Sequence, residues 1–183
     1  MRRINALISV AMLLLFLFHV IEGGLELAGM IKGGSQVFLF LSYVLIALLA
    51  LHVLIGMKYT VDTILAGKRS GIFYVKENRL FLIRRISGFA LLILLALHIY
   101  LFRGMGEGSA FRLRQFDLAA LVSQICMVLS LILHLLTNIR PLRIALGLAD
   151  KKNIKTDVAW ILAILLFLSG NAFFVYYLRW QVS

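Results

Sequence analysis

Four histidines are the residues in this sequence whose type and placement suggest chemistry. Each lies inside a long apolar segment, two to five residues before the segment ends: His19, His52, His98 and His134. Ionisable side chains are rare inside membrane helices and mark functional sites there. A neutral imidazole nitrogen is also the commonest protein ligand for metals. The four histidines are therefore candidate metal ligands, with hydrogen bonds between helices as the simpler alternative for any one of them.

The composition predicts a membrane protein built from helices. The chain has 183 residues, 62% of them hydrophobic, and a mean hydropathy of +0.99. A bilayer core about 30 Å thick needs about 20 mostly apolar residues per spanning helix. Five segments meet this requirement, which predicts an all-α fold with a single transmembrane domain over 1–183. These segments are 4–21, 37–57, 82–102, 117–137 and 158–178.

The distribution of basic residues predicts the orientation. The N-terminus and the segments 58–81 and 138–157, with their flanks, hold 14 of the 19 lysines and arginines. Because cytoplasmic loops are enriched in Lys and Arg, we expect a cytoplasmic N-terminus and an external C-terminus in the cell inner membrane. The net charge of +11 is then explained by membrane-facing loops, and no nucleic acid partner is expected.

Helix direction sorts the histidines into two pairs. Consecutive spanning helices run in opposite directions, so His19 and His98 should lie near the outer surface, and His52 and His134 near the inner one. If the first four helices form an up-down-up-down bundle, each pair comes from helices on one diagonal. The rise per residue in a helix separates the two levels by roughly 15–20 Å.

This arrangement favours two haems over other metal sites. A flat cofactor held from both faces needs two opposed ligands, and histidine is an established axial ligand of haem iron. Zinc would need three or four ligands converging on one point, and Cys126 is the only cysteine. The serines at 87 and 123 each precede a histidine by eleven residues, which places them on the same helix face at the other level. A bond to their own helix is the alternative for both serines, and Gly88 leaves room for a macrocycle.

At "RRISGFALLILLALH" the sequence resembles the dihaem cytochrome b membrane anchors of succinate dehydrogenases and fumarate reductases, specifically the single-chain, five-helix type. Arg85, Ser87, Gly88 and His98 match the pattern of that family. The segments "RRINALISVAMLLLFLFH", "LHVLIGMKYTVDTILAGKR" and "LILHLLTNIRPLRIALG" are similar to its first, second and fourth helices. The resemblance covers nearly the whole chain and implies the same pairing, with His52 and His134 at the proximal haem b and His19 and His98 at the distal one.

The resemblance also implies partners and a function. The chain would carry electrons between a cytoplasmic iron–sulfur subunit, itself bound to an FAD flavoprotein, and a lipid quinone, for which menaquinone is expected. It contains no catalytic set for the dicarboxylate and would contribute the quinone site. For the quinone protons the candidates are Glu22 and Glu26, with Arg103 as a weaker one. Arg84 and Arg85 are candidates for the propionates of the inner haem, and Gln124 and Asn171 for a quinone or a propionate.

Two other classes of protein are compatible with the same sequence features. The first is the dihaem cytochrome b subunit of another quinone-linked respiratory enzyme, although those known to us place two ligands on one helix or add a sixth span. The second is a haem-free transporter or assembly protein whose histidines relay protons. Further oligomerisation of the complex is compatible with every one of these functions.

Overall fold

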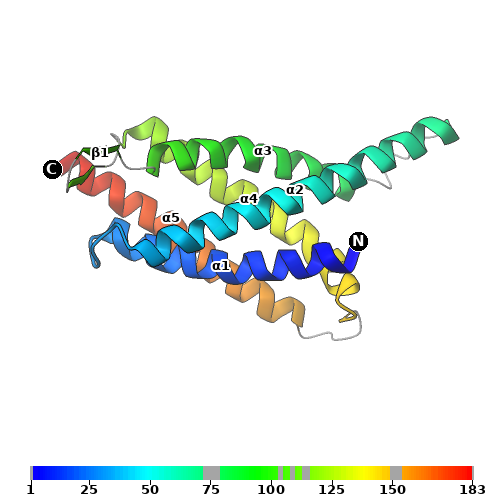
Figure 1. The fold of residues 1–183 in the computed structure, drawn as a ribbon, viewed down its shortest axis with the longest axis horizontal. Coiled ribbons are helices and arrows are strands. Elements are labelled where there is room, and N and C mark those ends of the chain that lie inside the picture. The colour runs from blue at the N-terminus through cyan, green and yellow to red at the C-terminus, as the bar shows by residue number, and fades with distance from the viewer. Residues whose placement is uncertain are drawn as a thin grey trace.

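A computed structural model describes residues 2–71, 79–102, 105–107, 110–112, 116–148 and 154–182. Its described part consists of five long helices and one small antiparallel hairpin, so the expected all-α class is confirmed (Figure 1). All five helices are long and apolar enough to cross a membrane. The elements are α1 (Arg2–Ala28), α2 (Gln36–Ser70), α3 (Arg79–Phe102), β1 (Met105–Glu107), β2 (Ala110–Arg112), α4 (Leu118–Ala145) and α5 (Ile154–Val182).

The helices extend beyond the apolar segments from which they were predicted. α1 runs to Ala28 instead of ending near residue 21, and α2 runs to Ser70 instead of ending near residue 57. The prediction that a loop begins after residue 57 is therefore wrong, because the helix continues to Ser70. Helical hydrogen bonds need no apolar side chains, so a helix continues into polar sequence until a residue stops it. For α2 that residue is Gly71, which has a left-handed φ of 68°.

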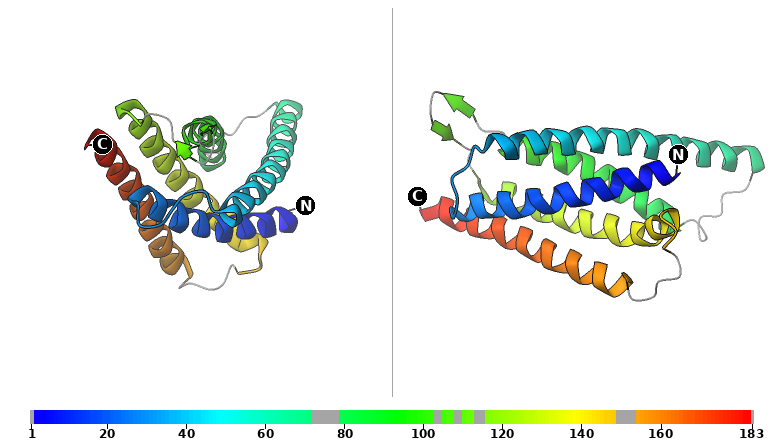
Figure 2. Two further views of the ribbon diagram at one scale, coloured as in Figure 1. Left: turned by 60° about the vertical axis from the view of Figure 1, so that its left-hand side comes forward. Right: turned by 60° about the horizontal axis from the view of Figure 1, so that its bottom comes forward.

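The first four helices form two hairpins that face each other. α1 packs along α2, α3 packs along α4, and α5 packs against α1 and α4. The described parts of α2 and α3 make no extensive contact, so the two hairpins are joined mainly through α5 and the contact of α1 with α4. Figure 2 shows this arrangement from two further sides.

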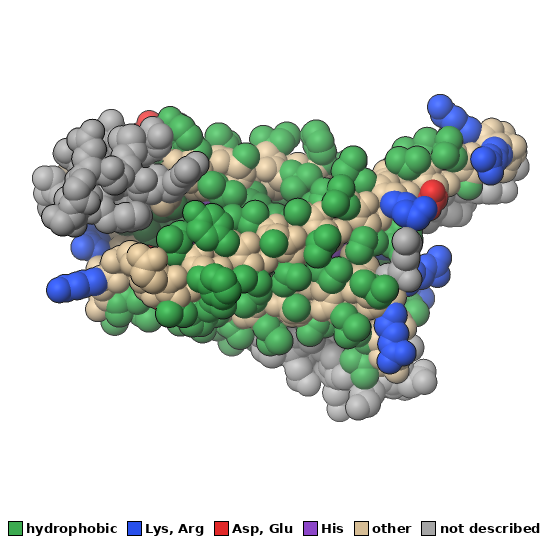
Figure 3. Space-filling view, viewed as in Figure 1, with side chains coloured by type: hydrophobic (Ala, Val, Ile, Leu, Met, Phe, Trp, Pro, Cys, Tyr) green, Lys and Arg blue, Asp and Glu red, His purple; other side chains and the backbone are tan. Residues whose placement is uncertain are grey.

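The outer surface of the bundle is apolar along its length and charged at its ends. Large hydrophobic side chains are exposed on all five helices, among them Leu14, Phe40, Phe89, Leu129 and Phe167. In Figure 3 they cover the visible face, and the lysines and arginines lie toward the two ends. Exposed apolar surface on this scale is unfavourable in water and favourable against lipid chains. The packed core is small and centres on Phe116, Val128, Leu162 and Phe173.

The turn that follows α1 fixes the C-terminal end of α5. Gly29 N–H donates to the carbonyl of Glu26 at 2.9 Å, and Met30 N–H donates to that of Leu25 at 2.9 Å. Together with the φ of 73° at Gly29, these bonds form a Schellman motif. Arg179 Nη1 of α5 donates to the carbonyl of Leu27 at 2.9 Å, and its guanidinium occupies the space that a Cβ on Gly29 would need.

We expect Gly29→Ala to destabilise the protein more than Gly34→Ala does. Both glycines have positive φ, but a Cβ on Gly34 meets nothing within 4 Å. Both variants therefore carry the left-handed backbone penalty of about 1–2 kcal/mol, and only Gly29→Ala also displaces Arg179, which adds about 1 kcal/mol for the lost hydrogen bond. Thermal unfolding in detergent measures the difference. Equal melting temperatures for the two variants would show that Arg179 does not brace this turn.

Candidate metal-binding histidine pairs

The four histidines meet as two pairs, and each pair joins one helix of each hairpin. The ring centres of His19 (α1) and His98 (α3) are 6.0 Å apart, with an angle of 66° between the ring planes. Those of His52 (α2) and His134 (α4) are 6.5 Å apart, at 80°. The structure thus brings together the same residues that helix direction groups by depth. We call them the outer pair and the inner pair, following the predicted orientation.

The separation within each pair fits two imidazoles on opposite sides of one metal ion. A metal–nitrogen bond of about 2 Å and a distance of about 1.2 Å from the nitrogen to the ring centre give about 6.3 Å between the two centres. The observed 6.0 and 6.5 Å lie on either side of this value. No three His, Cys, Asp or Glu side chains come together anywhere in the described residues. The donor sets there consist of two ligands, which suits axial ligation and not a tetrahedral zinc site.

A polar side chain from the adjacent helix holds the Nδ1 atom of every histidine. In the first hairpin, Ser9 Oγ of α1 lies 3.3 Å from His52 Nδ1, and Ser42 Oγ of α2 lies 3.4 Å from His19 Nδ1. Each helix therefore supports the histidine of the other. These two distances place the imidazoles of His52 and His19 in contacts within their own hairpin.

The second hairpin repeats this exchange. Ser87 Oγ of α3 lies 3.3 Å from His134 Nδ1, and Gln124 Oε1 of α4 lies 2.8 Å from His98 Nδ1. Gln124 is 0% exposed, and its amide nitrogen donates to Ser123 Oγ at 3.0 Å. Ser123 thus acts at the outer pair through Gln124 instead of touching a histidine itself. It also donates to its own helix, at the carbonyl of Ala120.

These contacts favour one tautomer of each imidazole ring. The three supporting serines each donate to a carbonyl of their own helix: Ser9 to Asn5, Ser42 to Phe38 and Ser87 to Arg84. With the hydroxyl hydrogen used there, the oxygen is left to accept from the histidine, which favours a protonated Nδ1. The carbonyl oxygen of Gln124 can only accept, which gives His98 the same tautomer. In this tautomer Nε2 carries the lone pair, as a metal ligand must.

The supporting residues lie ten or eleven positions from the histidine on the same helix. The spacings are Ser9 to His19, Ser42 to His52 and Gln124 to His134, all ten residues, and Ser87 to His98, eleven residues. At 1.5 Å per residue the two levels are about 15 Å apart, close to the separation expected from the sequence. Eleven-residue spacing alone finds Ser87 but misses Ser9, Ser42 and the support given by Gln124.

The inner pair has a glycine beside it. A Cβ on Gly88 would lie 3.2 Å from His134 Cε1 and 3.4 Å from its Nδ1, so a side chain here would push this ring away from α3 by a few tenths of an ångström. The sequence alone suggests that Gly88 leaves room for a macrocycle. The structure shows that it provides space for the histidine ring itself.

Polar atoms without partners lie on the inner side of the inner pair. Asn5 Oδ1, Tyr59 Oη and Arg85 Nε are buried and have no hydrogen-bond partner among the described residues. Arg85 stacks over the ring of Phe81 at 4.9 Å, and its Nη1 lies 3.3 Å from the position of a Cβ on Gly56, one helical turn past His52. Arg84 is half-buried like Arg85, but its Nε donates to the carbonyl of Leu80. Of the two arginines, Arg85 is therefore the better placed to bind a carboxylate at this level.

On the outer side, both candidate acids belong to α1. Glu22 and Glu26 are half-buried and lie within the helix, one turn apart. Glu26 Oε1 is buried without a hydrogen-bond partner among the described residues. Phe38 stacks on His19 with ring centres 5.1 Å apart. Asn171 donates to its own helix at the carbonyl of Phe167 and is exposed, and Arg103 lies outside the described residues.

Comparison with protein-family models, with curated proteins and with solved structures finds no match to this chain. The functional assignment therefore depends on the residues and their geometry.

Proposed function

We propose that this chain is the membrane-anchor dihaem cytochrome b subunit of a succinate:quinone oxidoreductase, a succinate dehydrogenase or fumarate reductase. The observation that carries the proposal is the pair of opposed histidine couples at two membrane levels, each with its Nε2 lone pairs available. The resemblance of the sequence to such anchors supports the choice of enzyme. The chain would transfer electrons between a peripheral iron–sulfur subunit and quinone.

Each histidine pair would hold one haem b, with His52 and His134 at the inner haem and His19 and His98 at the outer one. Bound haem supplies one-electron redox chemistry through its iron. The chain's own contribution is to fix ligand tautomer and ring orientation through Ser9, Ser42, Ser87 and Gln124. The buried, unpaired Nε of Arg85 suits a propionate carboxylate at the inner level.

The same contacts disfavour a proton relay through the histidines. A relaying imidazole takes up a proton at one ring nitrogen and releases one from the other, so both nitrogens must exchange protons. Here the Nδ1 proton of each ring is donated to one of two kinds of acceptor. Three rings donate to a serine whose own hydroxyl hydrogen is already donated to a backbone carbonyl, and His98 donates to the carbonyl oxygen of Gln124, which carries no hydrogen. Imidazole rings held in this way are better suited to act as fixed metal ligands.

Quinone chemistry would take place toward the outer end of the bundle. Quinol oxidation releases protons, so an acceptor carboxylate near water is required. Glu26 has a buried carboxylate oxygen without a partner among the described residues, and Glu22 lies one turn away on the same helix. We assign proton transfer to these two residues, with Glu26 as the group in contact with the quinone.

The residues that support the ligands should tune the two haems independently. An acceptor on Nδ1–H makes an imidazole a stronger donor and favours ferric iron. We therefore expect Gln124→Leu to raise the potential of the outer haem only, and Ser87→Ala to raise that of the inner haem only. A tenfold change in relative affinity for the two oxidation states corresponds to about 60 mV. Redox titration of the absorption spectrum measures both potentials. Equal shifts of both haems in either variant would contradict this division.

The choice of enzyme is tested in native membranes that contain the whole complex. We expect added succinate to reduce the b-type absorption, and fumarate to reoxidise it in the direction that the enzyme favours. A haem spectrum that responds to quinol but to neither dicarboxylate would assign the chain to another quinone-linked enzyme. The absence of any b-type absorption would exclude the whole class.

A further inference from the structure

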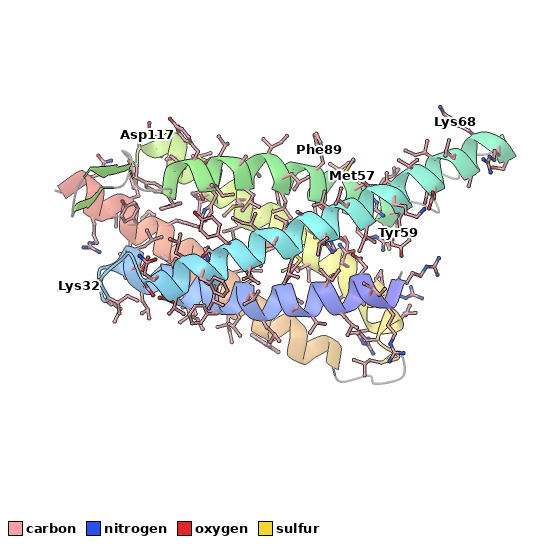
Figure 4. The ribbon with its side chains drawn as sticks, in the orientation of Figure 1. Lys32, Met57, Tyr59, Lys68, Phe89 and Asp117 are labelled. Carbon is pink, nitrogen blue, oxygen red and sulfur yellow. The ribbon has the colours of Figure 1, made fainter. Side chains whose placement is uncertain are left out.

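The C-terminal part of α2, residues 58–70, extends beyond the bundle (Figure 1). Figure 1 shows it extending past the ends of the other helices, and in Figure 4 Lys68 lies at its far tip while Met57 and Tyr59 lie where it departs. Every side chain from Val61 to Ala66 is exposed. We call residues 58–70 the α2 arm.

The α2 arm is amphipathic. Val61, Ile64 and Leu65 have the spacing of a single helix face, and they are 51%, 44% and 44% exposed. Met57 and Leu54, which are also exposed, continue this stripe back toward the bundle. The opposite side carries the small residues Thr60, Thr63, Ala66, Gly67 and Ser70. A stripe of this kind costs free energy in water unless another surface covers it.

Lipid is a poor candidate for that cover. α2 is continuous from Gln36 to Ser70, and its 35 residues correspond to about 52 Å of helix against a bilayer core of about 30 Å. The helix has no proline and no left-handed residue before Gly71, so nothing turns the arm to lie along the membrane surface. Counted from residue 57, Leu65 lies about 12 Å and Lys68 about 16 Å farther along the axis.

The charges indicate the kind of protein that fits. Lys58 and Arg69 border one edge of the apolar stripe and Lys68 follows it on the same face at the tip, whereas Asp62 is the only acidic residue of the arm and lies 3.5 Å from Lys58. An amphipathic helix with basic residues at one edge and at its tip is complementary to an apolar groove bordered by carboxylates. We propose that the α2 arm is a docking helix that inserts Val61, Ile64 and Leu65 into such a groove on a peripheral protein subunit. This deepens the proposed function, in which that subunit delivers or receives the electrons.

The test compares two variants of the full chain in its native membranes. The double substitution Ile64→Glu with Leu65→Glu places charges in the stripe, and Thr63→Glu places one on the opposite face. We expect the first to reduce the flavin and iron–sulfur subunits recovered per chain at least tenfold, and the second to leave them unchanged. Equal recovery in all three preparations would overturn the proposal.

A photo-crosslinking amino acid at position 65 identifies what covers the arm. We expect a crosslink to a peripheral subunit that contains flavin or an iron–sulfur centre, and none from position 63. Crosslinks only to lipid, only to a second copy of this chain, or to nothing would each overturn the proposal. The haem spectrum of the same samples reports folding and separates the two proposals. An unaltered chain without haem refutes the cytochrome function, whereas variants with normal haem and normal subunit recovery refute the docking helix alone.

Discussion

Replacing His52 with alanine is expected to halve the haem content, from two haems per chain to one. His52 and His134 are the only histidines at the inner level, and the outer pair is about 15 Å away and is supported by different residues. The outer haem should therefore remain with an unchanged spectrum. Haem extracted from the purified protein and quantified as its pyridine complex gives the number directly.

The matched variant is His98→Ala, which should remove the outer haem and spare the inner one. The two proteins should then have complementary spectra whose sum reproduces that of the unaltered chain. Retention of both haems in each of the four single histidine variants would show that these residues are not the ligands.

Gly88→Val is expected to have the second-largest effect, although residue 88 is not itself a proposed haem ligand. A Cβ at this position lies 3.2 Å from His134 Cε1, and the added methyl groups of valine need still more room. The ring must then move away from Ser87, and its Nε2 must leave the position opposite His52. Changes to groups that orient a metal ligand typically weaken metal binding about 10–100-fold, so we expect the inner haem to be lost during purification.

Gly170→Val provides the control for this substitution. Gly170 lies in α5, also in a spanning helix, and a Cβ there meets nothing within 4 Å. This variant carries the same change in helix propensity and should retain both haems. If Gly88→Val also retained two haems with normal spectra, the close approach of His134 to α3 would not be needed for haem binding.

Much of the architecture could be predicted from the sequence because each membrane-spanning helix requires a long run of apolar residues. Apolar runs of about 20 residues located all five helices, and alternation of helix direction grouped His19 with His98 and His52 with His134. What hydropathy could not predict was where the helices end. Polar residues such as Glu22, Glu26 and Lys58 continue α1 and α2, because the backbone is satisfied within the helix whatever the side chains are.

The support of the histidines was predictable only in part. Ser87 was found because it precedes the histidine of its own helix by nearly a whole number of turns. Ser9 and Ser42 precede the histidine of their own helix by ten residues, which leaves them about 80° from alignment on a straight helix. The crossing of neighbouring helices brings them to the imidazoles, and single-helix periodicity does not encode that crossing. A search for hydroxyl or amide residues ten or eleven positions before each histidine finds all four supporting residues.

The central claim is tested most directly by the reduced-minus-oxidised absorption spectrum of the purified complex, with haem quantified per chain. We expect b-type absorption, two haems per copy of this chain, and the low-spin signature of iron with two imidazole ligands at both sites. A preparation of the folded chain with no reduced b-type absorption would contradict this claim.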